Sequence, residues 1–437
     1  MKGSIIMKKT YLTSAFLMAV MAVSMTGCGD NSSVSENTSI FTSAKTAVSD
    51  SDETGEKTVK AYKTSSENKD SAEIKQLSNN TQETTFSERD LEQTADSSEA
   101  QKITVADNKT IDITAEGVYT ISGSAENCTI RVNADDSAKV QLVLDGVDIE
   151  NENFPAIYVL SADKVFITTT DSDNTLTVSG QFTTDDENNT DAVIYSKDDI
   201  VLNGTGTLNV TSYYGNGITC KDDMKLTGGT YNIKAVLDAF EANDTISVYD
   251  GTFNITTNKD GFHCENDEAE GSITITGGNF NINGASDGIQ ACALLQIDGG
   301  DFDITAAEGL EATYIVINDG NITIDASDDG INAVTNTNAY ETAIVFNGGN
   351  INVSVGQGDT DAIDSNGSIY VNGGTINVNA QMSSFDYDRT AEFNGGTIIV
   401  NGQEVSEIPQ SMMGGGMRGG MNGGMGGGFG GGRGGRF

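Results

Sequence analysis

Acidic residues return at the first position of a short block that recurs through the second half of the chain. The block opens with the acid, continues with Gly or Ala, and then alternates apolar and polar residues. Carboxylates held one above another repel each other unless a cation lies between them, and Ca²⁺ takes about 6–8 oxygen ligands. We therefore expect Ca²⁺ as a cofactor, although any single acid could instead close an Asx-type turn. The expected metal ligands at this position, with Asp328 beside them, are Asp238, Asp260, Asp287, Glu308, Asp329 and Asp361.

The fourth position of this block is polar and alternates with apolar or small residues at the third and fifth positions. Because side chains alternate between the two faces of a strand, the fourth should point outward when the others point inward. It adds three acids to the expected metal ligands, namely Glu241, Glu311 and Asp364. It also supplies three candidates for hydrogen bonds to sugar hydroxyls, namely His263, Gln290 and Asn332. His263 is the only histidine of the chain and could equally be an ordinary surface side chain.

A second repeated block determines how the first is positioned. Two apolar alternations flank a Gly-containing turn, as in Ile273–Ile282, and nine copies lie between residues 201 and 400. A unit of about 22 residues holds some three short strands and cannot bury its apolar side chains alone, whereas stacked units can. The sequence therefore predicts an all-β parallel β-helix. A β-propeller is the main alternative, but so short a unit holds too few strands for a blade.

Stacking of these units predicts ladders of equivalent apolar side chains inside the β-helix, about 4.8 Å apart. One ladder consists of Phe240, Phe262, Ile289, Leu310, Ile331 and Ile363. A second consists of Tyr231, Phe253, Phe280, Phe302, Ile322, Ile351 and Ile376. The repeats also align an outward column of Asn209, Asn232, Asn254, Asn281, Asn352 and Asn377. These amides either hydrogen-bond along the stack or contact sugar hydroxyls.

The N-terminus has the features of a bacterial lipoprotein signal. Lys8 and Lys9 precede an apolar run from Tyr11 to Val23, which is too short for a stable membrane span, and small residues lead to Cys28. We expect Cys28 to be lipidated, which would anchor the secreted protein to the membrane at the outer face of the cell. An ordinary signal peptide is the alternative.

Composition and repeats together predict five segments. They are a lipoprotein signal peptide (1–27), a disordered Ser/Thr/acidic linker (28–100), irregular first turns with a cap (101–190), the regular β-helix (191–402) and a Gly/Met/Arg-rich flexible tail (403–437). The polar stretch 401–410 is a candidate for a second cap.

The overall composition excludes several classes of protein. The 437 residues carry a formal charge of −40, with one histidine and no tryptophan. Such a charge opposes binding to nucleic-acid phosphates, one histidine cannot support a two-histidine mechanism, and a carbohydrate module built on a tryptophan platform is impossible. We expect a monomer with no nucleic-acid partner.

Motifs early in the expected β-helix resemble a known group. Gly117–Gly123, Val140–Ile149, Ala156–Val159 and Asn174–Val178, followed by the Gly-Gly-x-Phe-Asn-Ile repeats, are similar to the secreted carbohydrate-binding β-helix proteins of clostridia and related bacteria. The resemblance covers about residues 101–402. It implies a right-handed parallel β-helix related to polysaccharide lyases, bound Ca²⁺, and binding of cellulosic or acid-sugar polymers such as pectate.

The sequence therefore predicts a cell-surface-anchored protein that binds plant or envelope polysaccharide with the assistance of Ca²⁺. A polyanionic polymer would be repelled by the charge of −40 unless Ca²⁺ bridges the two. One alternative is a Ca²⁺-dependent lyase of the pectate type, in which Lys259 would be the base that removes a sugar proton. The scarcity of lysines favours a protein without catalytic residues. A non-catalytic structural adhesin is the other alternative.

Overall fold

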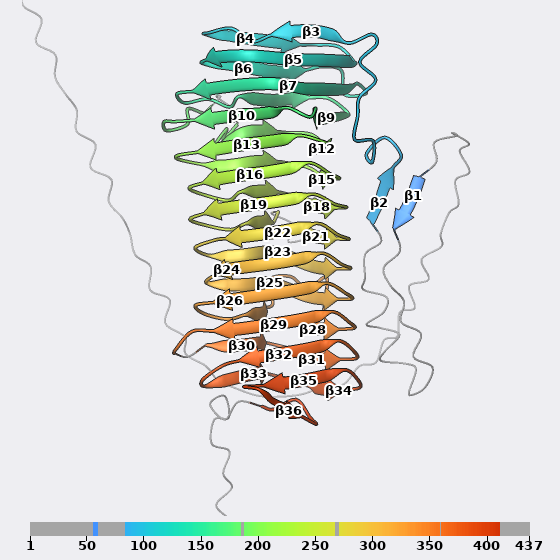
Figure 1. Cartoon of the computed structure of the whole chain (residues 1–437), viewed down its shortest axis with the longest axis vertical. Helices are drawn as coiled ribbons and strands as arrows, with labels where there is room; N and C mark the ends of the chain where they lie inside the picture. Colours follow the sequence, from blue (N-terminus) through green and yellow to red (C-terminus); the bar gives the residue numbers. More distant parts are fainter. Residues whose placement is uncertain (1–55, 60–83, 185–187, 267–270, 359, 411–437) are drawn as a thin grey trace, which may run out of the picture. The chain divides into compact units, whose positions relative to one another are not determined.

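The computed structural model describes residues 56–59, 84–184, 188–266, 271–358 and 360–410. The regular elements in these ranges are all β-strands, and 34 of them join into one sheet that winds into a parallel β-solenoid of about 12 turns (Figure 1). The predicted parallel β-helix is thus confirmed. We find no helix in these ranges with the length and apolarity to cross a membrane. Cys28, the expected signal peptide and residues 411–437 lie outside the described residues.

Each turn of the solenoid contributes one strand to each of three faces, which we call A, B and C. Strands of one face pair in parallel with their equivalents on the next turn. Face A consists of β4 (Lys109–Ile113), β6 (Cys128–Asn133), β8 (Ile157–Ser161), β11 (Ala192–Ser196), β14 (Asn216–Cys220), β17 (Phe240–Ala242), β20 (Phe262–Cys264), the first parts of β23 (Asp287–Ile297) and β25 (Glu308–Ile317), β27 (Ile331–Ala333), β30 (Asp361–Ser365) and β33 (Ser383–Tyr387).

Faces B and C continue each turn from face A. Face B consists of β3 (Gln101–Thr104), the first parts of β5 (Gly117–Glu126) and β7 (Lys139–Asn151), β9 (Lys164–Thr169), β12 (Ile200–Gly204), β15 (Met224–Leu226), β18 (Thr245–Val248), β21 (Ser272–Ile275), the ends of β23 and β25, β28 (Ala343–Phe346), β31 (Ser368–Val371) and β34 (Ala391–Phe393). Face C consists of the ends of β5 and β7, β10 (Asp173–Val178), β13 (Thr207–Ser212), β16 (Thr230–Ala235), β19 (Thr252–Thr257), β22 (Asn279–Asn283), β24 (Asp301–Ala306), β26 (Asn321–Ala326), β29 (Asn350–Val355), β32 (Thr375–Asn379) and β35 (Thr397–Val400).

The inward side chains stack in register, as the repeats predict. Phe240 pairs with Phe262 along face A, and Phe253 pairs with Phe280 along face C. The rings of Phe253 and Phe280 stack with centroids 4.8 Å apart. Phe253 also meets Phe240 and Phe262 edge-on, at 5.9 and 5.6 Å. The two ladders therefore interlock into one buried aromatic column that fixes the spacing of the turns.

The end of the expected disordered linker is ordered in the structure, which corrects the sequence prediction for that part. β2 (Thr84–Ser87) pairs antiparallel with β1 (Glu56–Val59). Asp90 is buried, and its Oδ2 lies 3.1 Å from Lys225 Nζ on face B. The guanidinium of Arg89 lies over the ring of Phe166, 4.4 Å from its centroid. A buried charge pair and a cation–π contact therefore hold this segment on the solenoid.

The C-terminal end of the solenoid is covered by a chain reversal. β36 (Gln403–Val405) pairs antiparallel with β35, and Ile408 is buried. Antiparallel pairing satisfies part of the last open strand edge. The described part of the expected flexible tail, residues 403–410, is thus attached to the last turn, as expected for a cap.

Candidate functional site

The acids at the first block position are bonded to the backbone of the following turn. The backbone N–H of Asp260 donates to Asp238 Oδ1 at 3.0 Å, and that of Asp287 donates to Asp260 Oδ1 at 3.0 Å. Further along, the N–H of Asp361 donates to Asp329 Oδ1 at 2.7 Å. These bonds link successive turns and do not close local Asx turns. One oxygen of each of these carboxylates therefore links two turns. The second oxygen can bind another side chain or a cation.

The glycine that follows several of these acids is required by the close stacking of turns. A Cβ on Gly288 would lie 2.6 Å from the carbonyl oxygen of Gly309, and a Cβ on Gly309 would lie 2.4 Å from that of Gly330. Any side chain at these positions would push adjacent turns apart. The Asp-Gly and Glu-Gly pairs thus hold the acids of successive turns close together.

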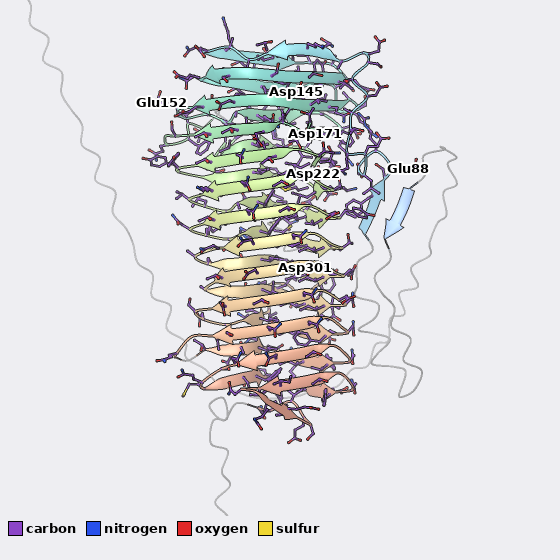
Figure 2. The ribbon with its side chains drawn as sticks, in the orientation of Figure 1. Glu88, Asp145, Glu152, Asp171, Asp222 and Asp301 are labelled. Carbon is purple, nitrogen blue, oxygen red and sulfur yellow. The ribbon has the colours of Figure 1, made fainter. Side chains whose placement is uncertain are left out.

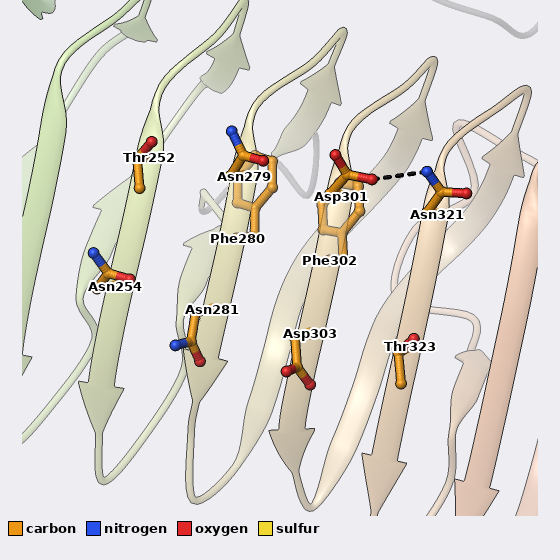
Figure 3. Close-up of a pocket in the computed structure, with 10 residues that line it drawn as sticks. All are labelled: Thr252, Asn254, Asn279, Phe280, Asn281, Asp301, Phe302, Asp303, Asn321 and Thr323. Carbon is orange, nitrogen blue, oxygen red and sulfur yellow. Dashed lines mark hydrogen bonds between the residues drawn. The ribbon is translucent and has the colours of Figure 1, made fainter.

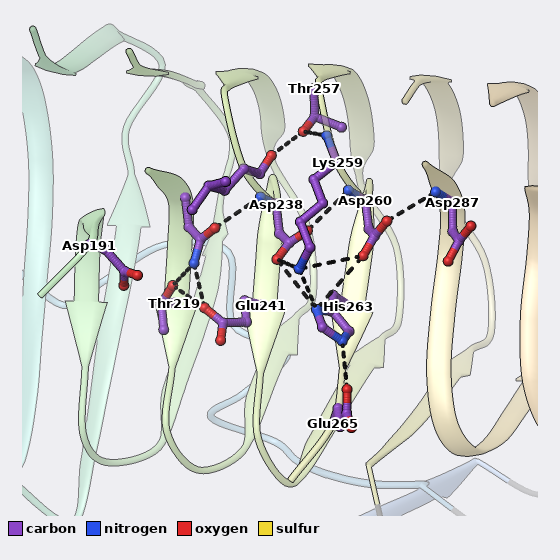
Figure 4. A network of polar contacts seen from close by, with 12 residues as sticks. Asp191, Thr219, Asp238, Glu241, Thr257, Lys259, Asp260, His263, Glu265 and Asp287 are labelled. Atoms are coloured by element: carbon purple, nitrogen blue, oxygen red, sulfur yellow. Dashed lines mark hydrogen bonds and ion pairs between the residues drawn. The ribbon is translucent and has the colours of Figure 1, made fainter. Parts of the chain in front are cut away.

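Four side chains form a compact network that we call the Lys259 cluster: Asp238, Lys259, Asp260 and His263 (Figure 4). Lys259 Nζ lies 2.9 Å from Asp238 Oδ2 and 3.9 Å from Asp260 Oδ2. His263 Nδ1 lies 3.3 Å from Asp238 Oδ2, and its Nε2 lies 3.4 Å from Glu265 Oε2. Asp238 and Asp260 are each only 2% exposed. The lysine and histidine thus compensate two buried carboxylates.

This pairing sets the protonation of the Lys259 cluster. Burial alone would raise the pKa of Asp238, but hydrogen bonds from His263 and Lys259 hold that pKa below its ordinary value. Burial alone would lower the pKa of Lys259, but the hydrogen bond to Asp238 and the charges of Asp238 and Asp260 raise it. A general base must be able to lose its proton near neutral pH. The raised pKa therefore does not favour Lys259 as the base of a lyase.

Glu241, on the turn before His263, is also fully engaged. Its Oε2 accepts hydrogen bonds from Asn216 Nδ2 at 2.5 Å and from Thr219 Oγ1 at 2.8 Å. Its Oε1 lies 3.0 Å from Lys221 Nζ. Three of the expected metal ligands, Asp238, Glu241 and Asp260, thus already have a protein cation beside them.

Beyond the Lys259 cluster the described part of the column contains acids and amides but no basic side chain. We call Asp287, Glu308, Glu311 and Asp364 the acidic cluster. None of the salt bridges found among the described residues reaches these four carboxylates. Their neighbours are amides: Gln290 Nε2 donates to Glu311 Oε1 at 2.9 Å, and Asn332 Nδ2 donates to Glu308 Oε2 at 2.9 Å.

Burial and repulsion from nearby acids make ionisation of Asp287, Glu308 and Asp364 unfavourable. Burial and the charges of Asp260 and Glu311 raise the pKa of Asp287 to about 7. Burial, with repulsion from Glu311 and Asp287, raises the pKa of Glu308 to about 8 despite its hydrogen bond from Asn332. Burial and nearby acids likewise raise the pKa of Asp364 to about 7. These carboxyl groups therefore keep their protons up to about neutral pH, because no salt bridge of the described residues compensates their charge.

The outward column of fourth-position residues is confirmed by the strand register. Glu241, His263, Gln290, Glu311, Asn332 and Asp364 pair successively along face A. The three expected sugar contacts use donors within the protein: His263 belongs to the Lys259 cluster, whereas Gln290 and Asn332 donate to acids. Asn332 Oδ1 is buried without a hydrogen-bond partner. Asp328 is exposed on the adjoining turn.

The structure extends this column beyond the residues that the sequence singled out. Upstream it continues through Tyr195, Tyr158, Arg131 and Asp112, and downstream it reaches Asp386. Arg131 Nε lies 2.6 Å from Asp112 Oδ1. The Ala-Ile-Tyr-Val motif at residues 156–159 has the block's alternation and could have revealed this extension.

A second acidic group lies where the chain passes from face A to face B. Ligand atoms of Asp199, Asp222 and Asp223 lie within 4.8 Å of one another. Burial and the neighbouring acids raise the pKa of Asp222 to about 6, and Lys164 Nζ lies 3.5 Å from Asp199 Oδ2. Figure 2 shows acids such as Asp145 and Asp301 on other turns. The negative charge is thus not confined to the column on face A.

Face C carries a shallow groove of about 360 Å³ across β19, β22, β24 and β26 (Figure 3). Two parallel rows of polar side chains line it, one residue from each strand in each row. The first row is Thr252, Asn279, Asp301 and Asn321, and the second row is Asn254, Asn281, Asp303 and Thr323. The buried rings of Phe280 and Phe302 lie between the rows.

Comparison with known proteins identifies similar chains. A family model described as "Carbohydrate-binding domain-containing protein" matches residues 107–360 and 313–422. A protein of that description from Acetivibrio thermocellus is 41% identical over 128 residues, which are 29% of this chain and 45% of the relative. The alignment thus spans less than half of that relative. A solved structure, the polysaccharide lyase-like protein from C. thermocellum in a gadolinium derivative, has 26% identity and a TM-score of 0.32 and covers 69% of this chain and 97% of its own.

Proposed function

Because the chain belongs to the family of carbohydrate-binding domain-containing proteins, we propose that it binds a polysaccharide at the outer column of face A, with Ca²⁺ held by the acidic cluster. The observation that carries this proposal is the half-buried set Glu308, Glu311 and Asp364, to which no described basic side chain is paired. A divalent cation would remove the repulsion that, with burial, raises the pKa values of Glu308 and Asp364. The buried Oδ1 of Asn332 adds an oxygen of the type that Ca²⁺ binds.

The charges along the same column favour the acidic cluster over the Lys259 cluster as the calcium site. An ammonium already lies beside both Asp238 and Asp260. A second cation there would meet the charge of Lys259 at close range. The remaining candidate ligands are Glu308, Glu311 and Asp364, which lie on the turns before and after Asn332, with Asp328, Asp329 and Asp361 at the same edge. Ca²⁺ bound there would leave coordination positions for hydroxyl or carboxylate oxygens of a sugar polymer.

An aromatic surface lies along the same edge of face A. Tyr213 and Tyr214 are each 57% exposed on the turn that leads into β14. The backbone N–H of Leu237 donates to the carbonyl of Gly215 at 3.1 Å, which fixes this turn against the next one. Exposed tyrosine rings offer a flat apolar surface with a polar hydroxyl, which suits the apolar face of a sugar ring.

Calcium titration tests the proposed metal site. Isothermal titration calorimetry with CaCl₂ should show binding to the wild-type protein, and Glu308→Gln/Asp364→Asn should weaken it more than about ten-fold because two ligands lose their charge. Polygalacturonate should bind in the presence of Ca²⁺ and be released by EDTA. The matched control is Asp325→Asn, an exposed acid on face C, which should behave as wild type. Polygalacturonate binding that persists unchanged in EDTA would contradict calcium-dependent recognition.

A lyase assay on the same polymer distinguishes an enzyme from a protein that only binds polygalacturonate. Unsaturated product from polygalacturonate is detected by its absorbance, and we expect none from the wild-type protein. Activity that appears with Ca²⁺ and disappears in Lys259→Ala would overturn this proposal in favour of an enzyme.

We further propose that Cys28 anchors the protein to the outer face of the cell membrane, because the residues before it fit a lipoprotein signal. Wild-type protein expressed in a bacterial host should sediment with membranes and take up labelled palmitate. Cys28→Ser should lose the label and remain in the soluble fraction. Equal partitioning of the two proteins would rule out this anchor.

A further inference from the structure

Along much of face C, amide side chains on successive turns donate hydrogen bonds to one another. Asn232 Nδ2 donates to Asn209 Oδ1 at 2.8 Å, and Asn254 Nδ2 donates to Asn232 Oδ1 at 2.9 Å. Further along, Asn377 Nδ2 donates to Asn352 Oδ1 at 3.2 Å. At these positions, the ladder therefore uses much of the amides' hydrogen-bonding capacity within the sheet.

Beyond Asn254, the second row of the groove loses this pairing. Among the hydrogen bonds of the described residues, none involves the side chains of Asn281, Asp303 or Thr323. Asn279 in the first row is likewise without one, whereas Asn321 Nδ2 donates to Asp301 Oδ1 at 2.7 Å. All six of these side chains are exposed, and all except that of Thr323 carry a carbonyl or carboxylate oxygen. The interruption leaves donors and acceptors open to a ligand.

The chemistry of the groove selects an uncharged ligand rich in hydroxyl groups. Asp301 and Asp303 supply carboxylate oxygens, and no basic side chain lines the groove. An anionic polymer would meet repulsion there. Hydroxyl groups can donate to the carboxylates and can both donate to and accept from the amides. The volume of about 360 Å³ also lies within the usual range of small-ligand sites.

The geometry of the groove suits an extended chain. Both rows advance by one residue per turn, about 4.8 Å, and they cross four consecutive strands of a rigid sheet (Figure 3). Successive units of an extended polysaccharide could therefore meet equivalent side chains on successive turns. Little ordering of the protein would be needed on binding.

From these observations we infer that the groove on face C is a second, metal-independent binding site for an uncharged polysaccharide chain. The inference rests on the proposed carbohydrate-binding function but assigns a different face, different residues and a different class of polymer. Asn281 and Asp303 are its central hydrogen-bonding residues. The acidic cluster on face A serves acidic polymers with Ca²⁺, whereas the groove needs no ion.

The test compares two double variants of the full chain in EDTA. The probes are neutral hexasaccharides of β-1,4-linked glucose, mannose and xylose, measured by isothermal titration calorimetry. Asn281→Ala/Asp303→Ala should bind the preferred hexasaccharide about ten-fold or more weakly than wild type, since each lost hydrogen bond is worth about 1 kcal/mol. The matched control, Asp325→Ala/Asn379→Ala, removes the same residue types from exposed positions of face C outside the groove lining. It should bind as wild type, and thermal melts should show that both variants are folded.

The outcomes separate this inference from the proposed function. Weaker binding by the groove variant, with calcium-dependent polygalacturonate binding retained, supports the second site. Hexasaccharide binding that is equal in wild type and groove variant overturns the groove assignment while leaving carbohydrate binding intact. The groove assignment is also overturned if the wild-type protein binds polygalacturonate with Ca²⁺ but none of the hexasaccharides. Failure to bind any saccharide, with or without Ca²⁺, overturns both proposals.

Discussion

Phe253→Ala is expected to lower the free energy of unfolding by about 3–5 kcal/mol. Phe253 is fully buried where the two inward ladders interlock, and its ring contacts four others. Removing it deletes two stacked and two edge-on contacts at once. The parallel strands of β16, β19 and β22 are paired in register, so the backbone has little freedom to close the cavity.

The loss should begin locally, because each turn of a solenoid contacts mainly its neighbours. Hydrogen exchange should therefore show the largest loss of protection in β16, β19 and β22, before the ends of the solenoid respond. Urea unfolding followed by circular dichroism measures the total effect. Thr256→Ala, an outward position on the same strand, is the control and should change stability by less than about 0.5 kcal/mol. If the two variants were equally stable, the aromatic column would not hold the turns together.

The architecture was predictable because it follows from alternation and repetition. A residue such as Phe253 must face inward when Asn254 faces outward, and stacking then places equivalents on neighbouring turns. The same reasoning placed Glu241, His263 and Gln290 in one outward column, as the register shows. Both statements concern faces and register, which a period of two residues determines.

The partners of individual side chains could not be predicted in this way. Lys259 lies on a turn, and the alternation of the strands says nothing about whether its long side chain reaches back to Asp238 or into solvent. The use of one Asp238 oxygen by the N–H of Asp260 depends on the tightness of the turn. Asp90 lies outside the repeats. Its segment contacts face B through individual side chains, among them Lys225. These features depend on tertiary contacts that a periodic pattern does not encode.

The second large effect concerns pH. In EDTA, the melting temperature of the wild-type protein is expected to fall by on the order of 5 °C between pH 5 and pH 8. The pKa values of Asp287, Glu308 and Asp364 are raised from 3.8, 4.5 and 3.8 to about 7, 8 and 7 by burial and repulsion. The folded state thus binds protons more tightly than the unfolded state. The stability that these groups contribute is fully present below about pH 4 and is lost as pH rises through 7 and 8.

Other groups act in the opposite direction at lower pH. The pKa of Asp238 is held below 3.8, because hydrogen bonds from His263 and Lys259 outweigh burial. Its contribution is present above about pH 4 and is lost as the pH falls through the depressed value. The metal-free protein should therefore be most stable near pH 5, between the two effects. Asp238→Asn should remove the loss on the acid side, and it should also lessen the loss between pH 5 and pH 8, because Asp238 raises the pKa of His263.

Calcium should reverse the fall in melting temperature above pH 5, because carboxyl groups must lose their protons before they bind the ion. The difference in melting temperature with and without Ca²⁺ is expected to be small at pH 5 and to grow towards pH 8. Glu308→Gln/Asp364→Asn should flatten both the metal-free decline and the calcium response, since it removes two of the three carboxyl groups whose pKa is raised to about 7 or 8. Asp325→Asn should retain both. A wild-type protein whose metal-free stability increased from pH 5 to pH 8 would show that the acidic cluster is not strained by its own charge, and the reason for placing Ca²⁺ there would be lost.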